Sequence, residues 1–110
     1  MSQDDGKLLE SSVLLHLCRK RGELERISYF MGEKECDFIV QHEDQVLQLI
    51  QVCWQMDDAK TREREIAGLW EAYKQTGCSH LSIITHQQEE TIEHNGLIIH
   101  VVPAWKWMLL

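Results

Sequence analysis

The stretch from Glu35 to Gln55 constrains the fold more than any other part of the chain. Two runs rich in β-forming residues lie on either side of the short polar break His42-Glu43-Asp44. Two such runs around a charged break are typical of a β-hairpin. Asp37 lies early in the first run and Gln51 well along the second. Polar side chains inside a buried hairpin need a compensating partner, so both residues are candidates for a site.

The remaining segments predict two long helices and several more strands. Apolar spacing predicts helices from Asp5 or Gly6 to about Lys20 and over about 59–76, with Asp57 or Asp58 as N-cap and Gly77 as C-cap of the second. Strands are expected over 24–31 and 81–85, and at 91–94 and 97–102 around the Asn95-Gly96 turn. The expected fold class is α/β, a single domain over residues 1–110 with a mixed β-sheet flanked by helices, in the order α-β-β-β-α-β-β-β.

The second long helix is expected to bury one stripe and expose a charged flank. Ile66, Leu69, Trp70 and Tyr73 form the predicted buried stripe. The segment Arg62-Glu63-Arg64-Glu65 is interpreted as a solvated face.

The register of the central hairpin decides whether Asp37 and Gln51 meet. A loop of only Glu43 and Asp44 places Asp37 opposite Ile50, and apolar matching (Phe38 with Leu49, Val40 with Leu47) favours this register. A three-residue loop, or a bulge, places Asp37 together with Gln51. A site built on both residues requires the second arrangement.

The charge balance limits the classes of partner. Eighteen acidic against eleven basic residues give a formal net charge of −7, which disfavours tight non-specific binding of nucleic acid. The run Arg19-Lys20-Arg21 is either a basic patch or, as we favour, cations at a helix C-terminus. No apolar run approaches the roughly 20 residues of a membrane span, and the acidic segment at 1–5 is unlike a signal peptide. We therefore expect a cytoplasmic protein.

The cysteines, histidines and tryptophans give no clear ligand pattern. Cys18, Cys36, Cys53 and Cys78 form no Cys-x-x-Cys pair, so we expect inert core thiols, not a zinc site or disulfides. The six histidines show no ligand spacing, so we assign at most one of them to any site. Trp70, Trp105 and Trp107 favour packing in a core or interface, with stacking on bases as the alternative.

The element order, with Asp37 and with Gln51 two positions before Cys53, resembles the restriction-endonuclease-like (PD-(D/E)XK) fold. The motif of that superfamily is an Asp on one strand, then Glu or Gln, any residue and Lys on the next, with a Glu often supplied by the first helix. Mapped onto this chain, these positions are Asp37, Gln51, Cys53 and Glu10.

A second resemblance covers nearly the whole chain. Five fragments in order look like a C-terminal domain of unknown function in bacterial and archaeal AAA-type ATPases: Lys7-Leu-Leu-Glu-Ser-Ser-Val, Glu35-Cys-Asp-Phe-Ile-Val, Leu49-Ile-Gln-Val-Cys-Trp, Thr61-Arg-Glu-Arg-Glu-Ile and Val102-Pro-Ala-Trp-Lys-Trp. In such ATPases the nucleotide site belongs to a separate N-terminal module. Nothing in this chain matches the phosphate-binding Gly-x-x-x-x-Gly-Lys-Ser/Thr loop, so we expect no ATP binding. The sequence leaves open whether the chain is a fragment or a stand-alone copy.

The resemblance implies Mg²⁺-dependent phosphodiester chemistry, with Asp37, Glu10 and Gln51 as tentative metal ligands. Cys53 stands where Lys is expected, and a neutral thiol does not replace an ammonium group. Lys34 is the alternative source of that cation.

We therefore expect a degenerate, non-catalytic nuclease-fold module that mediates interaction in, or is derived from, an AAA-type ATPase. The expected partners are an ATPase module or a second copy, contacted through the Trp105/Trp107 tail. The alternatives are a Mg²⁺-dependent nuclease and a module that binds nucleic acid without cleavage.

Overall fold

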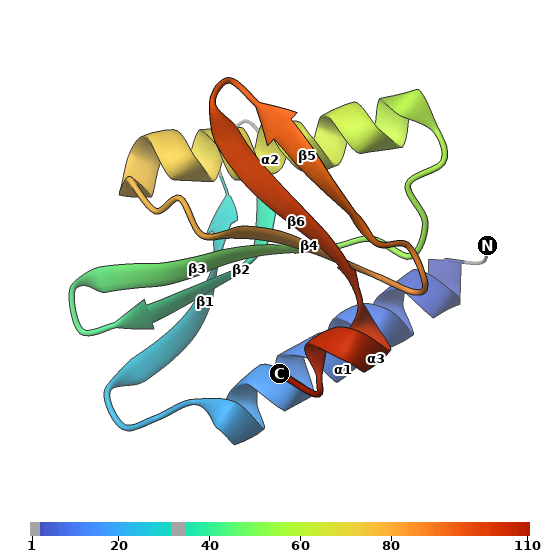
Figure 1. Ribbon diagram of the computed structural model, residues 1–110. Coiled ribbons are helices and arrows are strands. Elements are labelled where there is room, and N and C mark those ends of the chain that lie inside the picture. The colour runs from blue at the N-terminus through green and yellow to red at the C-terminus, as the bar shows by residue number, and fades with distance from the viewer. Residues whose placement is uncertain (1–2, 32–34) are drawn as a thin grey trace.

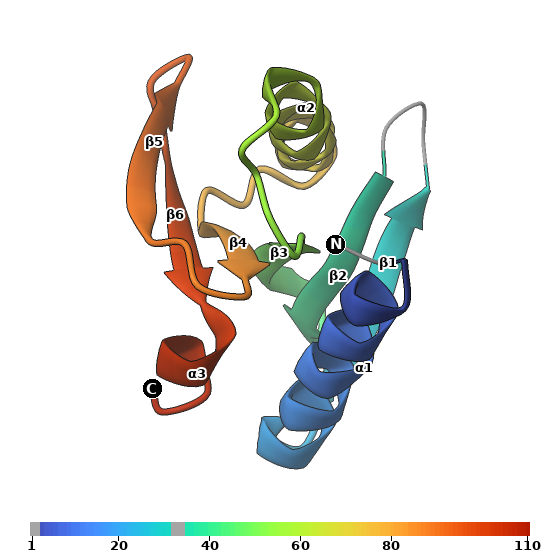
Figure 2. The ribbon, with the colours of Figure 1, turned by 90° about the vertical axis from the view of Figure 1, so that its right-hand side faces the viewer.

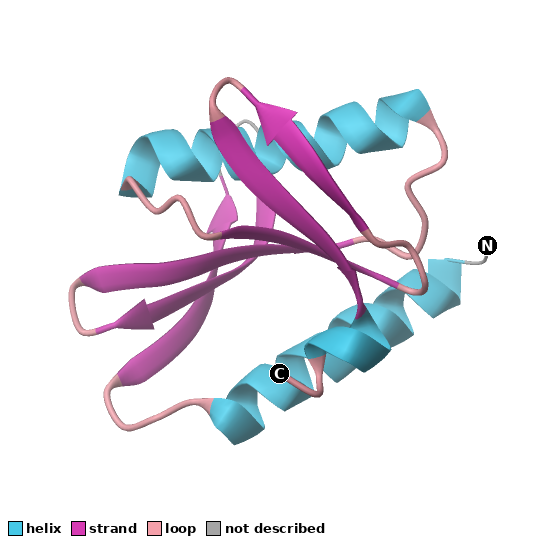
Figure 3. Cartoon of the chain, viewed as in Figure 1, coloured by secondary structure: helices cyan, strands magenta, loops and turns pink. Residues whose placement is uncertain are grey.

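A computed structural model describes residues 3–31 and 35–110 and shows a sheet between helices (Figures 1 and 3). Its elements are α1 (Gln3–Lys20), β1 (Glu25–Met31), β2 (Glu35–His42), β3 (Gln45–Val52), α2 (Ala59–Thr76), β4 (Leu81–Thr85), β5 (Glu90–His94), β6 (Leu97–Pro103) and the short α3 (Ala104–Trp107). The predicted order α-β-β-β-α-β-β-β is confirmed, with α3 added. The predicted turn at Gly32-Glu33-Lys34 lies outside the described residues.

The six strands form one mixed sheet in the order β1-β2-β3-β4-β6-β5. Strands β3, β4 and β6 run parallel to one another, whereas β1–β2, β2–β3 and β5–β6 pair antiparallel. Helix α2 covers one face, and α1 and α3 lie on the other (Figure 2). The α/β class with helices flanking a mixed sheet is confirmed, and the arrangement is compatible with a restriction-endonuclease-like fold.

Two hydrophobic clusters fill the spaces on the two faces of the sheet. The cluster against α2 includes Leu49, Met56, Leu69, Ile83 and Val101. The cluster under α1 contains Val13, Leu17, Phe38, Val40, Ile50 and Ile84, with Trp107 of α3 packed against it. Burial on both faces explains why β3 and β4 are apolar on both sides, as the sequence predicted for β3.

Helix α2 has the predicted bounds and caps. The Asp58 side chain accepts a hydrogen bond from the Thr61 N–H (3.2 Å). Gly77 adopts φ 75°, where a residue without a Cβ is least strained, and its N–H donates to the Tyr73 carbonyl (2.7 Å).

The buried face of α2 differs from the predicted stripe. It consists of Glu65, Gly68, Leu69 and Ala72, while Ile66, Trp70 and Tyr73 are only partly buried. The expectation that Glu65 is solvated was wrong. A Cβ built at Gly68 would overlap the Glu35 carbonyl oxygen and the Gln51 amide nitrogen, so the helix lies against β2 and β3 at this glycine. That close approach turns Glu65, one turn earlier, toward the sheet.

The β2–β3 hairpin contains the bulge that the sequence left as an alternative. Its pairs are His42–Gln45 and Gln41–Val46 next to the turn, but Val40–Gln48, Ile39–Leu49 and Phe38–Ile50 farther along. Leu47 is therefore the extra residue on β3, and the register expected from apolar matching was wrong beyond it. The shift of one position brings Asp37 level with Gln51.

Three of the four cysteines are buried, as expected, but Cys18 is exposed on α1. Burial raises the pKa of Cys36 to about 12 and that of Cys53 to about 11, so both thiols are neutral near pH 7. None of the described helices is long and apolar enough to cross a membrane.

Candidate functional site

Asp37 and Gln51 meet where β2 and β3 separate. The last ladder pair is Phe38–Ile50, and side chains replace the ladder beyond it. The Asp37 N–H donates to Gln51 Oε1 (2.9 Å), and the Val52 N–H donates to Asp37 Oδ2 (2.8 Å). Each side chain thus binds the backbone of the other strand. We call Asp37, Gln51 and their hydrogen-bond partners the β2–β3 junction.

The Gln51 amide is fully used within the junction. Its Nε2 donates to the carbonyls of Glu35 (2.9 Å) and Glu65 (3.1 Å), while Oε1 accepts from Asp37. The residue is 3% exposed. Two carbonyls and one N–H around a single amide also fix which end is nitrogen. Gln51 therefore joins β2, β3 and α2.

The carboxyl group of Glu65 is buried, that of Asp37 is partly buried, and the two influence each other. Burial raises the pKa of Asp37 to about 6; the Val52 N–H opposes this, while Glu10 and Glu35 add to it. Burial, helped by the charge of Asp37, also raises the pKa of Glu65 to about 7. Both groups are therefore partly protonated near neutral pH.

Asp37 and Glu10 line one cavity of about 400 Å³ on the α1 side of the sheet. Its walls are Glu10, Leu14, Tyr29, Glu35, Cys36, Asp37 and Phe38. Gln51 is not among these wall residues, and its amide reaches α2 instead. The structure thus brings Asp37 to both Glu10 and Gln51, but it does not gather the three side chains around one space.

Cys53, at the position of the motif lysine, belongs to the hydrophobic cluster against α2. It is 8% exposed, and its thiol donates to the Gln55 carbonyl (3.3 Å). The charges of Glu65 and Asp37 also raise the pKa of this thiol, so the position lies between the cluster and the two acids. A thiol supplies packing there but no positive charge.

A cation close to the site comes from α2. The charge of Arg64 lowers the pKa of both Asp37 and Glu65, and its guanidinium lies 3.6 Å from Glu65 Oε1. Its side chain is 68% exposed, so water screens much of this interaction. Lys34, the alternative proposed from the sequence, lies outside the described residues.

The side chains present do not fit the Mg²⁺ site that the resemblance implies. Mg²⁺ requires near-octahedral oxygen ligands. One Asp37 oxygen is engaged by Val52, and the Gln51 oxygen by Asp37. Within residues 3–31 and 35–110, no three His, Cys, Asp or Glu side chains are placed to hold a metal ion.

Glu65 is the site residue that sequence reasoning missed. Its neighbours at helical spacing, Gly68, Leu69 and Ala72, are small or apolar. A glycine inside a helix signals close backbone approach. Read together, those two signals place Glu65 on the buried face, whereas the run of charges around it pointed to solvent.

The fold and junction define an α/β domain with polar side chains at the split between two central strands. The chain is 34% identical, over 117 aligned residues, to the uncharacterized protein MJ1544 of Methanocaldococcus jannaschii. The alignment covers 98% of this chain but 26% of that relative, so the chain spans about a quarter of its length. No family model matches the chain. No solved structure matches it either.

Proposed function

We propose that this chain is a non-catalytic nuclease-fold module that mediates interaction within, or derives from, an AAA-type ATPase, and that it acts in the cytoplasm. The observation that carries the proposal is the Gln51 amide, whose three hydrogen bonds to backbone groups hold β2, β3 and α2 together. In the nuclease motif, the residue at the position of Gln51 is a metal ligand. In this chain the Gln51 side chain is instead engaged in hydrogen bonds that hold the fold.

The neutral, buried thiol of Cys53 supports the same conclusion. Phosphodiester cleavage needs a cation that stabilises charge on the phosphoryl group. A thiol whose pKa is raised to about 11 supplies no such charge. The matched region of the M. jannaschii relative is one part of a chain about four times longer, which is the arrangement expected of a module.

The C-terminal tail supplies a surface for the interaction. Trp107 packs against the cluster under α1, its ring 4.9 Å from that of His16, whereas Trp105 is 62% exposed. Leu109 and Leu110, in the same C-terminal segment, are also exposed. Tryptophan is enriched at the centres of interfaces, so Trp105 is the residue proposed to contact an ATPase module or a second copy of this chain.

The absence of catalysis is tested by incubating the chain with single- and double-stranded DNA and RNA plus Mg²⁺ or Mn²⁺. We expect the wild type and Asp37→Ala to leave all four substrates intact. Cutting by the wild type that Asp37→Ala abolishes would overturn the proposal.

The interaction is tested by mixing the chain with the remaining part of the M. jannaschii relative and measuring the mass of the complex by light scattering. Trp105→Ala should reduce association at least tenfold, whereas Tyr29→Ala, at another exposed aromatic, should leave it unchanged. A concentration-dependent dimer of this chain alone, lost in Trp105→Ala, identifies the second copy as partner. If neither association occurs, the interaction role is rejected.

Mg²⁺-dependent cleavage is the alternative that the resemblance implies; the described side chains form no metal site for it, and the interaction of Glu65 with Asp37 is the feature in its favour. The buried carboxyl group of Glu65 adds an acid that the motif positions lack. The cleavage assay above distinguishes the two candidates, with Glu65→Gln as a further variant. Binding of nucleic acid without cleavage is less favoured, because the cavity beside Asp37 carries Glu10 and Glu35.

A further inference from the structure

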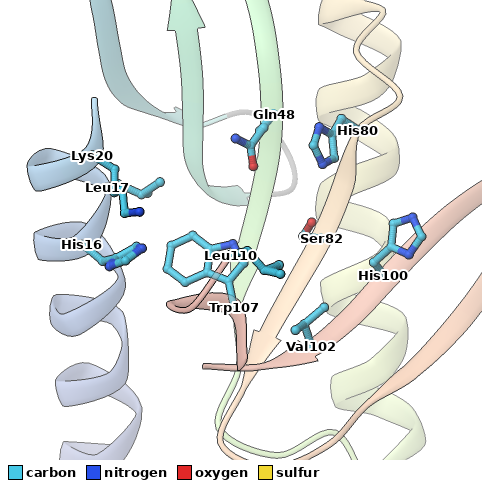
Figure 4. A pocket seen from close by; sticks show the side chains of 10 residues that line it. All are labelled: His16, Leu17, Lys20, Gln48, His80, Ser82, His100, Val102, Trp107 and Leu110. Carbon is cyan, nitrogen blue, oxygen red and sulfur yellow. The ribbon is translucent and has the colours of Figure 1, made fainter. Parts of the chain in front are cut away.

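A second cavity, of about 520 Å³, lies on the α1 side of the sheet and shares no lining residue with the cavity beside Asp37. Figure 4 shows its walls, which come from α1, β3, the start of β4, β6 and the C-terminal segment. Figure 2 shows α1 and α3 standing apart on this side of the sheet. The volume is in the range of small-molecule sites, about 300–1,000 Å³.

One wall of this cavity is polar. Ser82 of β4 pairs with His100 of β6. The Leu49 N–H donates to the His80 carbonyl (3.0 Å), which places His80 beside the strand position of Gln48. The side chains of Gln48, His80, Ser82 and His100 therefore share one end of the parallel strands, and His16 and Lys20 of α1 lie across the cavity from them (Figure 4).

Most of the polar side chains of this cavity make no hydrogen bond to the residues that the structure describes. Ser82 is 6% exposed in a strand whose five residues are all buried. In the part of the chain that the structure describes, its hydroxyl makes no hydrogen bond, nor do the side chains of Gln48, His80, His100 and Lys20. Thr85 of the same strand is different, because its hydroxyl is satisfied within the chain by donating to the Gln88 carbonyl (2.7 Å). The polar atoms of these side chains are reached from the cavity, since no fully buried side-chain nitrogen or oxygen among the described residues lacks a partner, and Lys20, His80 and His100 are exposed. They are therefore available to a ligand or to water in the cavity.

The titratable residues lining this cavity are all bases, although the chain carries a net charge of −7. None of the described residues that line it is an acid. Burial lowers the pKa of His16, and the charges of Lys20 and Arg19 lower it further, so this end of α1 has a positive potential. Such a potential attracts anions.

We propose that this cavity binds a small organic phosphate. Lys20, Ser82 and His100 line the cavity from three elements and would supply the donors, and an anion with several acceptor oxygens can accept from donors on different walls. Lysine commonly binds phosphate as a point charge. Leu17, Val102, Trp107 and Leu110 form the apolar wall for the organic part. This inference is independent of the function proposed for the β2–β3 junction.

The test is an NMR titration with phenyl phosphate, inorganic phosphate and phenol, following the histidine rings and the Trp107 indole slightly below neutral pH. Phenyl phosphate should bind saturably and shift His80, His100 and Trp107. Inorganic phosphate should bind about tenfold more weakly, because it leaves the apolar wall empty. Phenol that binds as tightly as phenyl phosphate would overturn the phosphate assignment.

Two variants separate a site from a general effect of charge. Lys20→Gln should weaken phenyl phosphate about tenfold or more, while Lys60→Gln, the same change on exposed α2 surface, should leave the affinity within about twofold. Ser82→Ala removes one hydroxyl without adding bulk and should also weaken binding severalfold. Equal losses in Lys20→Gln and Lys60→Gln, or the absence of saturable shifts in the wild type, would reject the site.

Discussion

Two polar clusters lie on the same sheet and differ in how their hydrogen bonds are used. At the β2–β3 junction, the Gln51 amide makes three hydrogen bonds to backbone groups. In the basic cavity, the amide of Gln48, three residues earlier on the same strand, makes none within the described chain. The residue type is the same and the strand is the same. The difference teaches that the partners of a polar group, more than its identity, distinguish a structural role from a binding role.

The largest expected loss of stability comes from a substitution in α2 that disrupts the β2–β3 junction. Gly68→Ala should lower the free energy of unfolding by about 3 kcal/mol or more, because the added Cβ overlaps the Glu35 carbonyl and the Gln51 amide. Gly6→Ala, in α1 with nothing within 4 Å of the added Cβ, should be neutral or stabilising by up to about 1 kcal/mol. Urea denaturation measures both, and two substitutions of similar effect would show that α2 is not held closely at Gly68.

The next effect compares the two glutamines directly. Gln51→Leu should cost about 3 kcal/mol, because it leaves the Asp37 N–H and the Glu35 and Glu65 carbonyls without partners. Gln48→Leu should cost less than about 1 kcal/mol, since no hydrogen bond within the described chain is lost. Chemical denaturation of both variants tests this, and equal losses would erase the distinction between the clusters.

The acids of the junction should make stability depend on pH. The folded-state pKa values of Asp37 and Glu65 are raised, to about 6 and about 7, so the folded protein binds more protons than the unfolded chain between about pH 4 and pH 7. The free energy of unfolding therefore contains a contribution that is present at acidic pH and lost as pH rises through this window.

Glu65→Gln should remove its share of that contribution and stabilise the protein at pH 7 and above by about 1–3 kcal/mol. Thermal unfolding at a series of pH values gives the measurement. If stability depends on pH in the same way in the variant and the wild type, the pKa of Glu65 is not raised by burial in the folded protein.

The smallest effect concerns two hydroxyls on β4. Ser82→Ala should change the free energy of unfolding by less than about 0.5 kcal/mol, because its hydroxyl has no partner within the described chain. Thr85→Val should cost about 1 kcal/mol or more through loss of the hydrogen bond to Gln88. Calorimetry on the two variants, without added anions, measures the difference. A larger loss for Ser82→Ala would mean that its hydroxyl already has a structural role.

Features set by local signals were predictable from the sequence. The caps at Asp58 and Gly77 fixed the bounds of α2, and Asn95-Gly96, with positive φ at both residues, fixed the β5–β6 turn. The bulge at Leu47 could not be predicted, because either register of the hairpin buries apolar residues and no glycine or proline marks the shift. The basic cavity was also missed: His16, His80 and His100 are far apart in sequence and meet only through the packing of three elements.

Leu47 shows that a local backbone irregularity, and not residue identity alone, decides whether Asp37 and Gln51 meet. Between the turn and this pair, β3 carries one residue more than β2, and the bulge at Leu47 absorbs it; a regular ladder through Leu47 would set Asp37 opposite Ile50. Deletion of residue 47 would therefore leave a regular hairpin in which Val40 still pairs with Gln48 and Asp37 stays level with Gln51. When homologous chains are aligned, a gap at 47 is thus expected to leave the aspartate and the glutamine together, with a straighter hairpin in place of the bulge.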